Sequence, residues 1–148
     1  MADQAPLPAS RQEALDLLDE WWPVWTAFLD ELAARGEAEK VGREGWSAAE
    51  AVAHVARWQA WSVSRVAQLA AGERLAEVDI DGQNAGWAEE DRGISWAQAR
   101  ALAETSQAAF REAVAGVPEE GWRRSLGRLV VANSSEHYQE HMDWRATG

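Results

Sequence analysis

Helix-start signals recur along this 148-residue chain, and they constrain its fold more than any other feature. Ser10 and Ser47 are each followed three residues later by a glutamate, and Ser95 is followed in the same way by a glutamine. In such a capping box the serine oxygen accepts a hydrogen bond from the backbone amide three residues on. The Glu or Gln side chain then reaches back to the serine amide. Three helices are therefore predicted to begin at these serines.

Apolar residues at intervals of three and four extend these starts into long amphipathic segments. Helices are predicted over residues 10–35, 47–71, 95–115 and 126–144, with a shorter one over 81–90. No segment has a convincing strand pattern. The expected fold is all-α: a four-helix bundle with a long crossover between its second and third helices. We expect a flexible leader over residues 1–9 and a single domain over residues 10–148.

Composition excludes several classes of function. The chain has no cysteine, which rules out disulfides, thiolate metal sites and a cysteine nucleophile. Its formal net charge is −11, which argues against the basic face that nucleic acid binding usually needs, and the nearest approach to such a face is Arg123, Arg124 and Arg128. We find neither a signal peptide at its start nor an apolar run that could span a bilayer. We therefore expect a cytoplasmic protein that binds neither nucleic acid nor membrane.

The chain has only three histidines, and their positions suggest a metal site. His137 and His141 are four residues apart, so they project from one helix face and can hold one ion together. His54 lies on a predicted neighbouring helix and could supply a third nitrogen. Three neutral imidazoles leave a coordination position open, as in catalytic zinc sites. The alternative is that each histidine is a hydrogen-bonded core residue, which is commoner for a lone histidine on an apolar face.

Ten tryptophans are an unusual number for this length. Trp58 and Trp61 follow His54 along one helical stripe, so they are expected to line an apolar substrate pocket. Trp21, Trp22 and Trp25 spread apolar surface around more than one face of the first helix. This surface is expected to form either a homodimer contact or a wall of the substrate cleft.

Two segments together resemble a known family. Trp46-Ser47 followed by His54 and Trp58 resembles the opening of the second helix in DinB-like (DinB/YfiT) proteins. The run N-S-S-E-H-Y-Q-E-H over residues 133–141 resembles the closing helix of the ClbS/DfsB branch of that family. Residues 79–84 and 89–92 also resemble that branch, and the likeness covers about residues 10–144.

The resemblance implies a four-helix bundle with a long crossover and frequent dimerisation. It also implies a divalent metal, often zinc or nickel, held by three histidines that correspond to His54, His137 and His141. Some relatives use a low-molecular-weight thiol as co-substrate, and the branch includes a protein that hydrolyses a genotoxin. The expected function is thus a metal-dependent hydrolase or thiol transferase acting on a small electrophilic or toxic molecule.

Three further side chains are candidates for catalysis or substrate orientation. Asn133 lies one turn before His137, and Asn84 lies in the predicted crossover. Glu50 lies one turn before His54 and could act as a base or support a ligand, although its capping role is the safer assignment. Two other functions stay open: a protein that sequesters a small molecule in the same Trp-lined pocket, and a purely structural bundle without metal.

Overall fold

The protein is all-α in a computed structural model, which describes residues 6–42 and 45–144. The elements are α1 (Arg11–Ala34), α2 (Ala48–Ala70), α3 (Ile80–Glu90), α4 (Trp96–Ala115), the short 3-10 helix η1 (Glu119–Gly121), α5 (Arg124–Ala132) and α6 (Ser135–His141). The described ranges contain no strand, and their only β-type pairing is the bridge between Val41 and Ser47. The predicted all-α class is confirmed.

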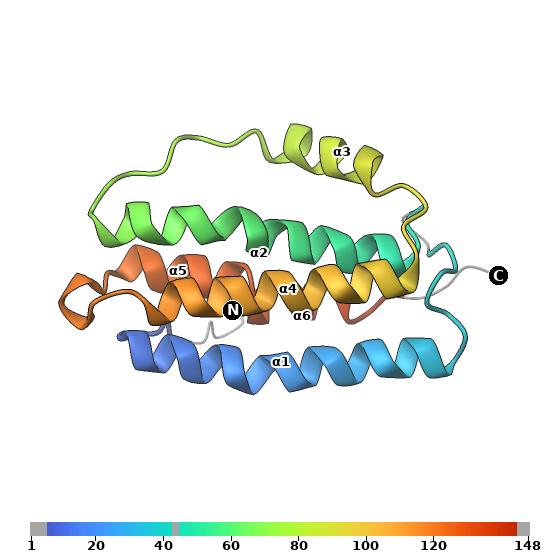
Figure 1. The fold of residues 1–148 in the computed structure, drawn as a ribbon, viewed down its shortest axis with the longest axis horizontal. Helices are drawn as coiled ribbons and strands as arrows, with labels where there is room; N and C mark the ends of the chain where they lie inside the picture. The colour runs from blue at the N-terminus through green and yellow to red at the C-terminus, as the bar shows by residue number, and fades with distance from the viewer. Residues whose placement is uncertain (1–5, 43–44, 145–148) are drawn as a thin grey trace.

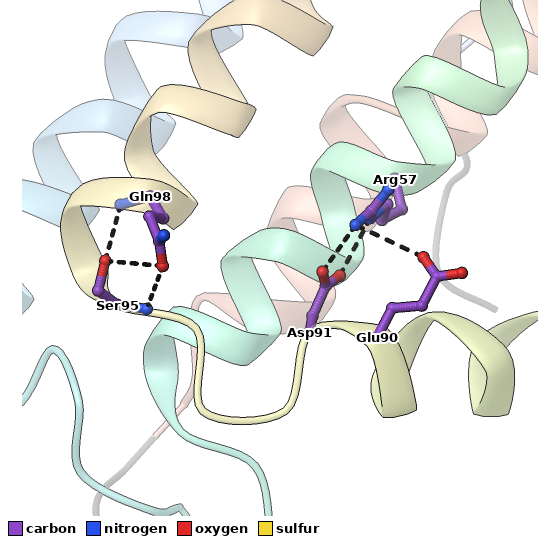
Figure 2. Close-up of polar contacts among 5 residues, drawn as sticks. All are labelled: Arg57, Glu90, Asp91, Ser95 and Gln98. Carbon is purple, nitrogen blue, oxygen red and sulfur yellow. Dashed lines mark hydrogen bonds and ion pairs between the residues drawn. The ribbon is translucent and has the colours of Figure 1, made fainter.

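The predicted helix starts are confirmed, with one difference in detail. Ser47 and Ser95 make complete capping boxes, and Figure 2 shows the bonds between Ser95 and Gln98. Ser10 also caps its helix, since its side chain accepts from the amide of Glu13. The Glu13 carboxylate, however, accepts from the amide of Ala9 at 2.8 Å, one residue before the serine.

The prediction of one continuous helix over residues 126–144 is wrong. The last segment is two helices, α5 and α6, that are interrupted at Asn133 and Ser134. The Asn133 amide donates to the carbonyl of Leu129 at 3.1 Å, and the Ser134 hydroxyl donates to the carbonyl of Val130 at 2.5 Å. Short polar side chains that bond the preceding turn compete with the helical backbone. The backbone of Ser134 accordingly leaves helical geometry, with φ −134° and ψ −99°.

Figure 1 shows α1, α2, α4 and the α5–α6 pair lying side by side along the long axis of the molecule. Helices α2 and α4 run in the same direction, and the connection between them carries α3 back along the outer side of α2. Buried apolar residues form two clusters. One includes Leu18, Phe110 and Leu126, and the other includes Trp25 and Tyr138.

None of the residues of α3 is buried. Polar and aromatic contacts, rather than a buried apolar face, hold this helix against α2. The guanidinium of Arg57 donates two hydrogen bonds to the carboxylate of Asp91, at 2.7 and 3.1 Å, and also pairs with Glu90 (Figure 2). The indole N–H of Trp58 donates to the side-chain oxygen of Asn84 at 2.8 Å. Together these contacts set the position of α3 beside α2.

The expected leader, residues 1–9, lies partly outside the described residues. Where it is described, it is bonded to the segment before α5: the indole N–H of Trp122 donates to the carbonyl of Pro8 at 3.1 Å. None of the helices in the described ranges combines the length and the apolar character that crossing a membrane would require.

Candidate metal centre

The three histidines meet in space, although 83 residues separate His54 from His137. His54 lies on α2, while His137 and His141 lie on successive turns of α6. Each can offer one ring nitrogen such that the three atoms lie within 4.8 Å of one another. The ring centroids are 4.9–5.2 Å apart, and no two rings are stacked.

The spacing of two of these nitrogens fits a tetrahedral metal. The Nε2 atoms of His54 and His137 are 3.2 Å apart. Zinc–imidazole bonds of about 2.0–2.1 Å at tetrahedral angles would place two ligand nitrogens roughly 3.3 Å apart. The two imidazoles therefore stand at nearly the separation that one shared ion would require. Without an ion, the same contact is a hydrogen bond in which one ring donates and the other accepts.

Burial keeps two of the rings neutral. It lowers the pKa of His54 to about 4, with a smaller contribution from the neighbouring His141. It lowers the pKa of His137 to about 3, again with contributions from the other two histidines. A metal ligand must offer a lone pair, so a neutral imidazole is the competent form. Near pH 7 both rings are ready to bind a cation without first losing a proton.

A small pocket opens beside His54. It is lined by Trp46, Glu50, His54, Trp87, Ala88 and Asp91. The indole of Trp46 lies 5.0 Å from the His54 ring, centroid to centroid. The pocket thus has aromatic walls from the segment before α2 and from α3, and a histidine at its side. Its walls are largely apolar with a few polar groups, and its enclosed space is small, on the order of one water molecule.

The predicted pocket residues Trp58 and Trp61 are not part of the lining of this pocket. Trp58 packs edge-on against Trp61 and against Trp87, at 5.2 and 4.8 Å between ring centroids. Trp61 in turn lies under the guanidinium of Arg65, 4.2 Å from its centre. Trp58 therefore contacts the pocket wall indirectly, by packing against Trp87, which lines the pocket.

Of the three candidate catalytic residues, only Glu50 lines the pocket. Its carboxylate accepts from the amide of Ser47 at 2.8 Å and from the amide of Gly93 at 3.3 Å. Asn84 holds the indole of Trp58, and Asn133 lies in the break between α5 and α6. These contacts give all three a structural task, and their part in catalysis stays a prediction.

Sequence reasoning did not single out Gln59, a fully buried residue of α2 whose side chain bonds residues of the α5–α6 segment. Its side-chain amide donates to the carbonyl of Asn133 at 3.0 Å and to the hydroxyl of Tyr138 at 2.7 Å. The available signal was a glutamine on the same helical stripe as the apolar residues Val52, Val55 and Val66. Trp46 and Trp87 were likewise not proposed as pocket walls, because neither shares the helical stripe of His54.

Comparison with known proteins adds no family assignment: no model of a protein family, no curated protein and no solved structure matches this chain.

Proposed function

We propose that this chain is a metal-dependent enzyme that acts on a small electrophilic or toxic molecule. Its divalent ion would be held by His54, His137 and His141. The observation that carries the proposal is the meeting of all three histidines of the chain at one point. Scattered surface histidines would have no reason to converge from α2 and α6.

The proposal includes membership of the DinB-like family and its four-helix bundle. Helices α1, α2, α4 and the α5–α6 pair would be the four helices, with α3 inside the long crossover. Motif likeness at residues 46–58 and 133–141 supports this assignment, since these segments carry the three histidines. As in that family, we propose a homodimer in the cytoplasm.

Zinc or nickel is the ion that we propose. The donors are three imidazole nitrogens without a thiolate, and zinc and nickel both accept such a set. When bound, a divalent ion with an open position supplies the Lewis acidity that activates water or a thiol as a nucleophile. Because the chain has no cysteine, any thiol would be a low-molecular-weight co-substrate brought in from outside.

The chain's own residues would bind and orient the substrate. Trp46 and Trp87 present apolar surface beside His54, which suits the carbon framework of a small molecule. Glu50 is the carboxylate closest in sequence to a ligand that also lines the pocket, and we propose that it orients the substrate. Its two backbone hydrogen bonds hold the carboxylate in place for that task.

The first test is metal content in protein purified without a nickel column. We expect about one ion per chain in the wild type and none in His137→Ala, because two remaining imidazoles bind far more weakly. Gln139→Ala is the matched control, since Gln139 is exposed on the same helix. Wild-type protein that neither carries nor takes up zinc or nickel would contradict the proposal.

A second candidate function is sequestration, which the aromatic walls of the same pocket favour. Turnover separates it from catalysis. Hydrolysis or thiol transfer on a model electrophile that requires added metal would support the enzyme. Quenching of tryptophan fluorescence by the same compound, with no product formed, would support sequestration instead.

A further inference from the structure

The break between α5 and α6 frees a backbone carbonyl next to the metal centre. In a continuous helix the carbonyl of Asn133 would accept from the amide of His137. Here that carbonyl accepts from the side chain of Gln59, at 3.0 Å. A residue of α2 thus takes the place of a helical partner at the start of the segment that carries two of the histidines.

Gln59 holds α6 at a second point as well. The same amide nitrogen donates to the hydroxyl of Tyr138, at 2.7 Å. Tyr138 directly follows His137 in the chain, and its ring stacks on Trp25 of α1 at 4.8 Å. Gln59 and Tyr138 are each only 1% exposed, so water does not compete for these bonds.

These contacts connect the two helices that supply the candidate ligands. His54 and Gln59 both belong to α2, while Tyr138 lies between the two ligands of α6. The hydrogen bonds of Gln59 therefore fix how α6 sits against α2, close to where His54 meets His137. A buried amide is also directional: it accepts only those positions of α6 that keep both bonds short.

We infer that Gln59 is a positioning residue of the metal centre, which sets the separation of His54 from the histidines of α6 by holding Asn133 and Tyr138. The inference rests on the proposed metal site, and it adds a group that touches neither the ion nor the substrate. Removal of an outer group that orients a ligand typically lowers metal affinity 10–100-fold.

The test compares Gln59→Met with Val66→Ala. Methionine keeps much of the side-chain volume but donates no hydrogen bond. Val66 is buried on the same helix in the other apolar cluster, so its truncation lowers stability without touching α6. We expect Gln59→Met to bind zinc about 10–100-fold more weakly than wild type and to change the visible spectrum of bound cobalt. Val66→Ala should keep wild-type affinity and spectrum.

Tyr138→Phe keeps the inference testable if Gln59→Met does not fold. It removes one of the two bonds and leaves the ring on Trp25, so it should give an intermediate loss of affinity. Folded Gln59→Met or Tyr138→Phe protein with wild-type zinc affinity and cobalt spectrum would overturn the inference alone. Wild-type protein that binds neither metal would overturn the metal site and this inference with it.

Discussion

At the scale of single residues, the candidate centre depends on imidazoles that stay neutral. His137 is 8% exposed and has two histidines as neighbours, so a proton on its ring would be both poorly solvated and repelled. This lowers the cost of binding a cation at neutral pH, because no proton has to leave first. It also makes the metal-free protein sensitive to acid.

We expect the free energy of unfolding of the metal-free protein to fall as the pH drops below about 6.5. Unfolded histidines take up protons near that pH. Folded His54 and His137 stay neutral until the pH approaches about 4 and 3. The unfolded state therefore binds more protons in this window. Above about pH 6.5 both rings are neutral in the folded and the unfolded state, so they do not make stability depend on pH. Below that pH the free energy of unfolding falls by up to about 1.4 kcal/mol per pH unit for each histidine.

Urea unfolding in the presence of a chelator, at pH values between 7 and 5, measures this slope. A double variant, His54→Gln with His137→Gln, serves as control because glutamine does not titrate. Its stability should change less over the same window. Equal slopes for the two proteins would show that these rings are not held neutral.

At the scale of helices, α3 is attached to the rest of the fold mainly through side chains of α2. It buries none of its residues, and the segment before it has no regular structure. Its attachment relies on the Arg57–Asp91 pair and on the contacts of Trp58. Asp91 is only 7% exposed, so its carboxylate depends on that arginine for much of its solvation. Because Trp87 and Asp91 line the pocket, the position of α3 also determines the shape of that pocket.

Arg57→Met is expected to loosen α3 without unfolding the protein. Removal of the guanidinium takes away two charge-assisted hydrogen bonds and should cost about 1.5–3 kcal/mol locally. Amide hydrogen exchange over residues 80–90 measures the effect. Arg92→Met is the control, since its pair with Glu89 is exposed on both sides and contributes little. Unchanged exchange in Arg57→Met would mean that other contacts hold α3.

At the scale of the whole molecule, the candidate centre joins parts of the chain that are distant in sequence. Its candidate ligands come from α2 and α6. Tyr138, which lies between the two histidines of α6, belongs to the apolar cluster that contains Trp25. An ion bound there would link the second helical segment to the last one. In the unfolded chain His54 is not kept near His137 and His141, so binding of one ion by all three should favour the folded state.

Zinc is accordingly expected to raise the melting temperature. Free zinc at about one hundred times its dissociation constant would add about 2.7 kcal/mol of stability. For a domain of this size that corresponds to a shift of roughly 5–10 °C. Calorimetry with zinc and with a chelator measures the difference. In His54→Ala the two curves should coincide, and a wild-type protein that behaved in the same way would contradict a bound ion.

Local sequence determined most of the helices. Capping by Ser10, Ser47 and Ser95 needs only residues within one helical turn, so the starts of α1, α2 and α4 could be predicted correctly. The same holds for the i, i+4 pair of His137 and His141, because helical geometry alone places both on one face. The approximate position of α3 could also be predicted from local sequence, since the short helix expected over residues 81–90 nearly coincides with Ile80–Glu90.

Only the tertiary structure decided the rest, because it depends on contacts between distant segments. The approach of His54 to His137 requires α2 and α6 to pack together, which no local pattern encodes. The interruption at Ser134 places the carbonyl of Asn133 where Gln59, 74 residues earlier, can bond it. Likewise Trp46 and Trp87 become pocket walls only once α3 lies against α2. Sequence thus indicated which residues could form a site, and packing determined which of them meet.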